Sequence, residues 1–126
     1  MGYTFSKSDR VLRREDFLAA QKRGRRVHTT HFVLVLFDRG DAHGPRLGLV
    51  TSRKVAAAVG RNRVRRQLRE TFRLHRARFP ARHDVVVIAK EGAAALDSAA
   101  LRGEILGALE RGAAPRRRPP ASRAPA

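Results

Sequence analysis

Residues 60–73 read GRNRVRRQLRETFR and carry the strongest pattern in the chain. Six of these residues are arginine, and Glu70 is the one acid among them. A helix surface that only has to be soluble mixes charges of both signs, whereas this stretch has almost one sign. It therefore predicts a concentrated positive field of the kind that binds nucleic acid.

Helical geometry separates the same stretch into two faces, at roughly 100° per residue. The apolar face carries Val64, Leu68, Phe72, His75 and Phe79. The opposite face carries Asn62, Arg65, Arg66, Arg69, Arg73 and Arg76. The pattern predicts a helix over residues 61–79, limited by Pro80, that packs one side on a sheet and turns its arginines outward. Asn62, uncharged among charges, suits a hydrogen bond to a sugar or a base edge.

An ordinary solvated helix face is the alternative interpretation of this pattern. Such a face is stabilised by ion pairs three or four residues apart. Glu70 is the only acid between residues 61 and 82, so ion pairs within the helix cannot account for the arginines.

The composition of the whole chain points the same way. Its 126 residues suffice for one domain, 42% of them are hydrophobic, and 28 lysines and arginines against 11 acids give a net charge of +17. A polyanionic partner is the natural compensation for that charge. Cysteine is absent, which excludes disulfides and thiolate metal sites. No apolar run is long enough to cross a bilayer, and no signal peptide is evident, so we expect a cytoplasmic protein without a membrane partner.

Further elements are expected before the basic helix. Residues 13–23 predict a short helix with Phe17, Ala20 and Gln21 on one face and Gly24 as its stop. A short strand is expected over residues 26–29 and longer strands over 31–37 and 46–52, with a turn between the two longer ones. We expect these two longer strands to pair as an antiparallel hairpin.

Two elements are expected after the basic helix. Residues 84–89 read DVVVIA, a strand of the buried type. A closing helix is predicted from residue 94 or 97 to about 109, because Leu101, Ile105 and Leu109 recur every four residues.

These elements define an α+β fold, an α/β sandwich in the order α-β-β-β-α-β-α, with about four strands and helices on one face of the sheet. Residues 1–9 are expected to be a flexible start and residues 10–110 an RNA-binding domain. Residues 111–126 read RGAAPRRRPPASRAPA and predict a disordered basic tail.

The stretch from Arg61 to Arg73 resembles the RNR signature of the bacterial ribonuclease P protein subunit. The resemblance continues on both sides of it. Arg10, Leu12, residues 15–17 and Gly24 are similar to the first helix of that family. Residues 32–34, 46–54, 58–59 and 84–90 are similar to its strands, its basic turn and the approach to its signature. About residues 9–110 are covered, in order.

The resemblance implies a specific function. Proteins of this family are cofactors of a ribozyme, whose RNA, with bound magnesium, hydrolyses precursor tRNA to release the 5′ leader. The chain is then the protein part of an endonuclease, with the catalytic RNA and precursor tRNA as partners and with no catalytic side chain, metal or small-molecule substrate of its own. The family fold contains a left-handed β-α-β crossover around the signature helix, where the general rule predicts a right-handed one.

The resemblance also assigns site residues. Those that would contact the catalytic RNA are Arg61, Asn62, Arg63, Arg65, Arg66, Arg69 and Arg73. Those that would line a groove for the leader are Phe17, Phe32, Ser52, Arg53, Lys54 and Lys90. The chain departs from the family at Gln21 and Val35, where aromatic residues are common, and at Ala56, where glycine is usual.

Simpler interpretations stay open for some of these residues. Phe17 and Phe32 can be core residues, and residues 52–54 can be a charged strand end. His28 and His31 lie three apart in a strand-like region and do not have the spacing of a zinc site. A ribosomal or chromatin-like binding protein without catalytic context is the alternative function.

Overall fold

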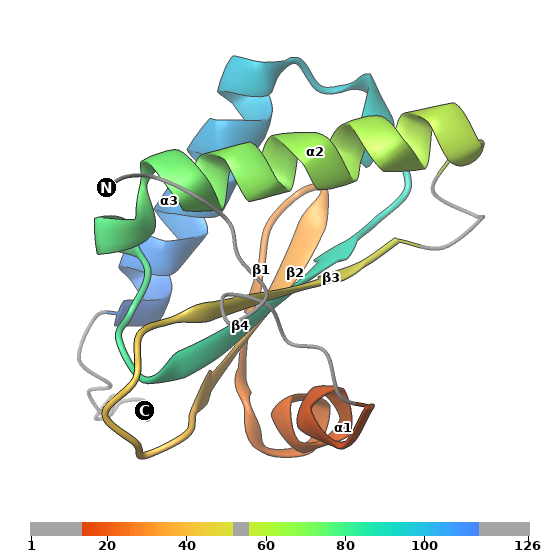
Figure 1. The fold of residues 1–126 in the computed structure, drawn as a ribbon. Helices are drawn as coiled ribbons and strands as arrows, with labels where there is room; N and C mark the ends of the chain where they lie inside the picture. Colours follow the sequence, from red (N-terminus) through yellow and green to blue (C-terminus); the bar gives the residue numbers. More distant parts are fainter. Residues whose placement is uncertain (1–13, 52–55, 114–126) are drawn as a thin grey trace, which may run out of the picture.

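The computed structural model describes residues 14–51 and 56–113. One sheet forms the middle layer, α2 and α3 cover one face of it, and α1 lies against the other face (Figure 1). In chain order the elements are α1 (Arg14–Arg23), β1 (Arg25–His28), β2 (Phe32–Asp38), β3 (Arg46–Val50), α2 (Ala58–Leu74), η2 (Arg76–Arg78), β4 (His83–Ala89), η3 (Ala93–Ala95) and α3 (Ser98–Ala113). The predicted order of helices and strands is confirmed.

The four strands of the sheet lie in the order β1-β2-β4-β3. β2 is antiparallel to both β1 and β4, whereas β3 is parallel to β4, with Arg46 opposite Asp84. The predicted hairpin of β2 and β3 is therefore wrong, because β4 lies between them. The seven residues from Arg39 to Pro45 allow the chain to pass over the position of β4, which a tight turn would not.

β2 and β4 supply side chains to two separate cores. On one face Phe32, Leu34 and Leu36 join the residues of α2 and α3 in the larger core. On the other face Val33 and Val35 pack with Ala20 of α1 in a smaller core. Successive side chains of a strand point to opposite faces, so the continuous apolar runs reflect burial on both sides. The prediction that the helices cover only one face of the sheet is wrong, because α1 lies against the other face.

α2 begins at Ala58 and ends at Leu74, earlier than the predicted residue 79. His75 leaves the helical conformation, and its N–H bonds the carbonyl oxygen of Thr71 at 2.9 Å. A short turn, η2, follows and returns Phe79 to the core, where its ring meets that of Phe72 edge-on with centroids 4.8 Å apart. The predicted burial of Val64, Leu68, Phe72 and Phe79 is confirmed.

α3 packs beside α2 and continues to Ala113. Its apolar stripe of Leu101, Ile105 and Leu109 is buried, as predicted. The helix extends beyond its predicted end near residue 109, into the segment that was expected to be a tail. The helix continues because Gly112 packs against β1, where Arg25 donates a hydrogen bond of 2.8 Å to its carbonyl oxygen.

The predictions for residues 1–9, 52–54 and 114–126 concern segments outside the described residues. In the described parts of the chain, no helix combines the length and the apolar character that a membrane span requires.

Candidate nucleic-acid interface

The arginine face of α2 is formed by Asn62, Arg65, Arg66, Arg69 and Arg73. Asn62, Arg66 and Arg69 are exposed, and Arg65 and Arg73 are half-buried. The side chains of Arg66 and Arg69 have no hydrogen bond or ion pair with any residue that the structure describes. Their guanidinium groups are thus available to phosphate, which they match as planar forks.

Two contacts organise the arginine face. Arg65 donates to the side-chain oxygen of Asn62 at 2.9 Å, one helical turn away. Arg73 grips both carboxylate oxygens of Glu70 at 2.6 to 3.2 Å. The hydrogen bond from Arg73 lowers the pKa of Glu70, so this acid stays ionised and offsets Arg73. The face keeps a positive surplus from Arg65, Arg66 and Arg69.

The first turn of α2 adds to the positive field. It contains no acidic residue, and Ala57 supplies no side-chain cap to the exposed N–H groups. Within the first turn and at Ala57, no side chain offsets the positive end of the helix dipole, which lies at the same place as Arg61 and Asn62.

Arg61 and Arg63 belong to the signature but differ from the arginine face. Arg61 donates to the carbonyl oxygen of Ala56 at 2.8 Å. Arg63 reaches across to η3 and donates to the carbonyl oxygens of Ala94 and Leu96 at 2.7 and 3.0 Å. Their predicted contact with RNA stays a prediction, and Arg63 already has a structural task.

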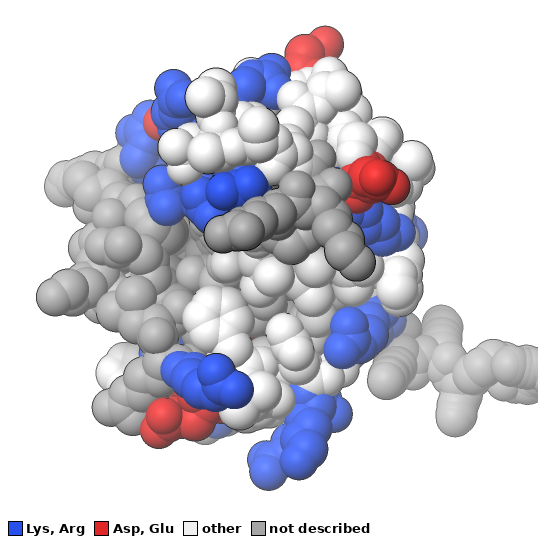
Figure 2. Space-filling view, turned by 90° about the vertical axis from the view of Figure 1, so that its right-hand side faces the viewer, with Lys and Arg blue, Asp and Glu red and all other residues white. Residues whose placement is uncertain are grey.

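A second surface lies on the other side of the sheet, beside α1. Arg14, Phe17, Leu18, Gln21 and Val50 line an open groove of about 400 Å³. Phe17 is half-buried, since one side of its ring packs on the smaller core while the rest borders the groove. Figure 2, which looks from the end where α2 begins, shows lysines and arginines above and below an uncharged area.

The predicted groove residues separate in the structure. Phe17 lines the groove, and Lys90 lies at the end of β4, where its ammonium donates to the carbonyl oxygen of Thr29 at 2.6 Å. Phe32 was assigned to the groove wrongly: its side chain is 0% exposed and points into the larger core, on the opposite face. Ser52, Arg53 and Lys54 lie outside the described residues.

Sequence reasoning placed Gln21 on the same face as Phe17 but missed Arg14, Leu18 and Val50 in the groove lining. Phe17, Leu18 and Gln21 follow Arg14 at three, four and seven residues, which places all four on one face of α1. That spacing was the available signal. No sequence signal indicates Val50, because its approach to α1 depends on the sheet topology.

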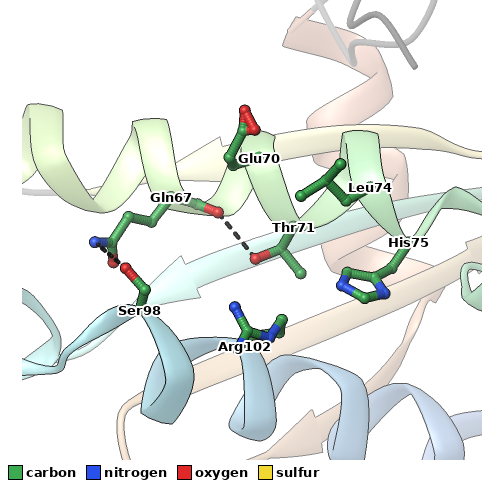
Figure 3. A pocket seen from close by; sticks show the side chains of 7 residues that line it. All are labelled: Gln67, Glu70, Thr71, Leu74, His75, Ser98 and Arg102. Atoms are coloured by element: carbon green, nitrogen blue, oxygen red, sulfur yellow. Dashed lines mark hydrogen bonds between the residues drawn. The ribbon is translucent and has the colours of Figure 1, made fainter. Parts of the chain in front are cut away.

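A small pocket between α2 and α3 offers no competing site. Its volume is about 70 Å³, enough for a few waters and well below the roughly 300–1,000 Å³ of ligand pockets. Figure 3 shows Gln67 donating to the hydroxyl of Ser98, at 3.0 Å, and Thr71 donating to the carbonyl oxygen of Gln67, at 2.9 Å. The pocket is a small gap between two helices, and the hydrogen bond between Gln67 and Ser98 bridges them beside it.

Comparison with known proteins identifies the family. The family model described as Ribonuclease P matches residues 5–112. The ribonuclease P protein component of Desulfovibrio desulfuricans is 45% identical over 112 residues, which cover 86% of each chain. That of Geotalea uraniireducens is 39% identical and covers 86% of this chain and 95% of its own.

Solved structures agree. The ribonuclease P protein of Staphylococcus aureus superposes with a TM-score of 0.78 at 28% identity, over 85% of this chain and 97% of its own. The ribonuclease P protein of Thermotoga maritima superposes with a TM-score of 0.73 at 32% identity, over 81% of this chain and 96% of its own. With its arginine-faced helix, its α1 groove and these relatives, the chain belongs to the ribonuclease P protein family.

Proposed function

We propose that this protein is the cofactor of a ribonuclease P ribozyme and supports removal of the 5′ leader from precursor tRNA. The observation that supports this most is the placement of two different surfaces on opposite faces of one sheet, in a chain of this family. One is an arginine face suited to structured RNA, and the other is a groove with one aromatic ring, suited to a single strand.

In this proposal the arginine face holds the catalytic RNA. Its arginines neutralise phosphates and release condensed counterions, so the affinity falls steeply with salt. Asn62, held by Arg65, offers its amide to a sugar or base edge. The RNA carries the chemistry and binds the magnesium, and no side chain of this protein acts as acid, base or nucleophile.

The groove beside α1 receives the leader. Phe17 offers a ring on which a base stacks, a contact that tolerates any sequence. Arg14 stands at the same groove and suits a backbone phosphate. Lys90, and Ser52, Arg53 and Lys54 by the family resemblance, would extend this contact. The protein thus binds and orients a substrate that the RNA cleaves.

Reconstitution with the ribonuclease P RNA of the same organism tests the function. At limiting magnesium, adding the protein is expected to raise the rate of cleavage at the 5′ end of mature tRNA. The protein heated and left unfolded is the control for nonspecific charge effects. A protein that binds the RNA but leaves this cleavage rate unchanged would be a basic binding protein of another kind.

A further inference from the structure

Five charged residues form an alternating chain on the α1 side of the sheet. They are, in spatial order, Asp41, Arg39, Asp84, Arg46 and Asp16. The chain starts in the loop after β2, crosses β4 and β3, and ends on α1. Each arginine lies between two acids, so every charge in it is matched by a neighbour.

Asp84 is the buried centre of this chain, with 1% of its side chain exposed. Arg46 grips it with two hydrogen bonds of 2.7 and 2.8 Å, from the register position opposite on β3. Arg39 adds a third, at 2.8 Å. A buried carboxylate held by three hydrogen bonds from two arginines is fixed in position, because any other orientation would leave its buried charge without these donors.

The outer links tie this centre to its surroundings. Arg39 also binds Asp41, at 2.9 and 3.1 Å, and the carbonyl oxygen of Gly44, at 2.6 Å, which fixes the loop. On the other side, Arg46 extends to Asp16 of α1, with 3.4 Å between its nitrogen and the carboxylate oxygen.

The contact with Asp16 joins Arg46 to the same turn of α1 that carries Phe17. Asp16 directly precedes Phe17, so the two side chains leave the helix about 100° apart. When Arg46 holds Asp16 at the charged end of the sheet face, Phe17 is directed to the groove beside Val50. At its other end α1 is fixed by close packing, where Ala20 is fully buried and Gly24 approaches Val35.

We propose that Asp84, Arg46 and Asp16 are positioning residues for leader binding, which hold Phe17 at the groove. This rests on the proposed function of the groove. Arg46 and Asp16 act through the orientation of α1 and do not line the groove themselves.

Asp16→Asn in the reconstituted holoenzyme is the main test, because Asp16 is partly exposed and its loss should not unfold the protein. Simple electrostatics predicts tighter RNA binding when an acid is removed. The positioning role predicts the opposite for substrates with a leader: precursor tRNA should bind about fivefold more weakly, the lower range for losing one base–aromatic stack. Mature tRNA and the catalytic RNA should bind as before.

Asp38→Asn is the matched control. It makes the same change of charge and breaks an ion pair of 2.9 Å with Arg82, but it does not involve α1. Arg46→Met should reproduce the effect of Asp16→Asn, and Arg46→Lys should restore part of the affinity. Thermal unfolding of each variant identifies any that fail to fold. If an Arg46 variant does not fold, the binding of precursor tRNA to the Asp16→Asn holoenzyme alone tests the proposal.

Unchanged or tighter binding of precursor tRNA to the Asp16→Asn holoenzyme would overturn the proposal. Equal weakening for precursor and mature tRNA would also overturn it. If the unmodified holoenzyme itself does not distinguish precursor from mature tRNA, the proposed function of the groove fails instead.

Discussion

Arg63 donates a hydrogen bond of 2.7 Å to the carbonyl oxygen of Ala94, 31 residues further along the chain. One arginine of the RNR signature therefore joins α2 to η3. The contact is invisible in the sequence, where Arg63 looks like its neighbours. It separates an arginine that shapes the fold from the arginines for which we propose contact with RNA.

Arg66→Ala and Arg69→Ala are expected to weaken binding of the catalytic RNA. Each should also reduce the slope of log affinity against log salt by about one unit, because one phosphate contact is lost. Titration of the RNA at several salt concentrations measures this. Arg102→Ala on α3 removes an exposed arginine outside the arginine face and serves as the control. Slopes that match the unmodified protein would exclude both residues from the interface.

Arg63→Ala is expected to act on stability. Two partly buried carbonyl oxygens lose a charged donor, so the free energy of unfolding should fall by about 1–3 kcal/mol. Urea denaturation measures it, with Arg66→Ala expected to stay within about 0.5 kcal/mol of the unmodified protein. Equal stability of the two variants would contradict the structural role of Arg63.

Phe17→Ala is expected to weaken precursor tRNA binding by roughly 5- to 150-fold, the equivalent of about 1–3 kcal/mol for one stacked base. Binding of mature tRNA should not change. Phe37→Ala is the matched control, since Phe37 packs on the same smaller core but does not line the groove. Equal losses for the two substrates would mean that Phe17 contacts no leader.

Glu104→Gln tests how α3 is fixed to the turn between β1 and β2. Glu104 accepts hydrogen bonds from the hydroxyl of Thr29 at 2.7 Å and the backbone N–H of His31 at 3.0 Å, and its other oxygen lies 2.6 Å from Nδ1 of His31. Burial raises the pKa of Glu104, but the hydrogen bonds from His31 and Thr29 outweigh it and the net shift is downward.

The sign of this shift gives a pH dependence. A carboxyl with a lowered pKa stabilises the fold above its ordinary value of 4.5, and that stabilisation is lost as the pH falls through and below it. The variant should be less stable near neutral pH, by about 1–3 kcal/mol. The difference should shrink in acid, as measured by urea denaturation across pH. A difference that is constant with pH would show that the charge of Glu104 is unimportant.

The features of the fold that depend on local periodicity could be predicted from the sequence. The arc of Val64, Leu68 and Phe72 was sufficient to orient α2, and Gly24 was sufficient to end α1. Pairing of strands is set by distant segments, so the insertion of β4 between β2 and β3 left no local mark. A continuous apolar run does not say which side chains face which layer, so it left Phe32 open between core and groove; the groove assignment came from the family resemblance, and the structure favours the core.

The candidate site also has a part that the sequence predicts and a part that it does not. Charge along one helix is a local property, so the arginine face was found. The groove needs α1, β3 and the sheet face together, and only the spacing on α1 was visible beforehand. The chain from Asp41 to Asp16 joins four segments and required the fold to be known.

β2 has a consequence for how the protein tolerates change. All five residues from Phe32 to Leu36 are buried, three toward the larger core and two toward the smaller one. No position among them offers a neutral substitution, because each lies against a packed layer. In a mutational scan this strand should form the least permissive window of the protein, while exposed positions on α3 accept most residues.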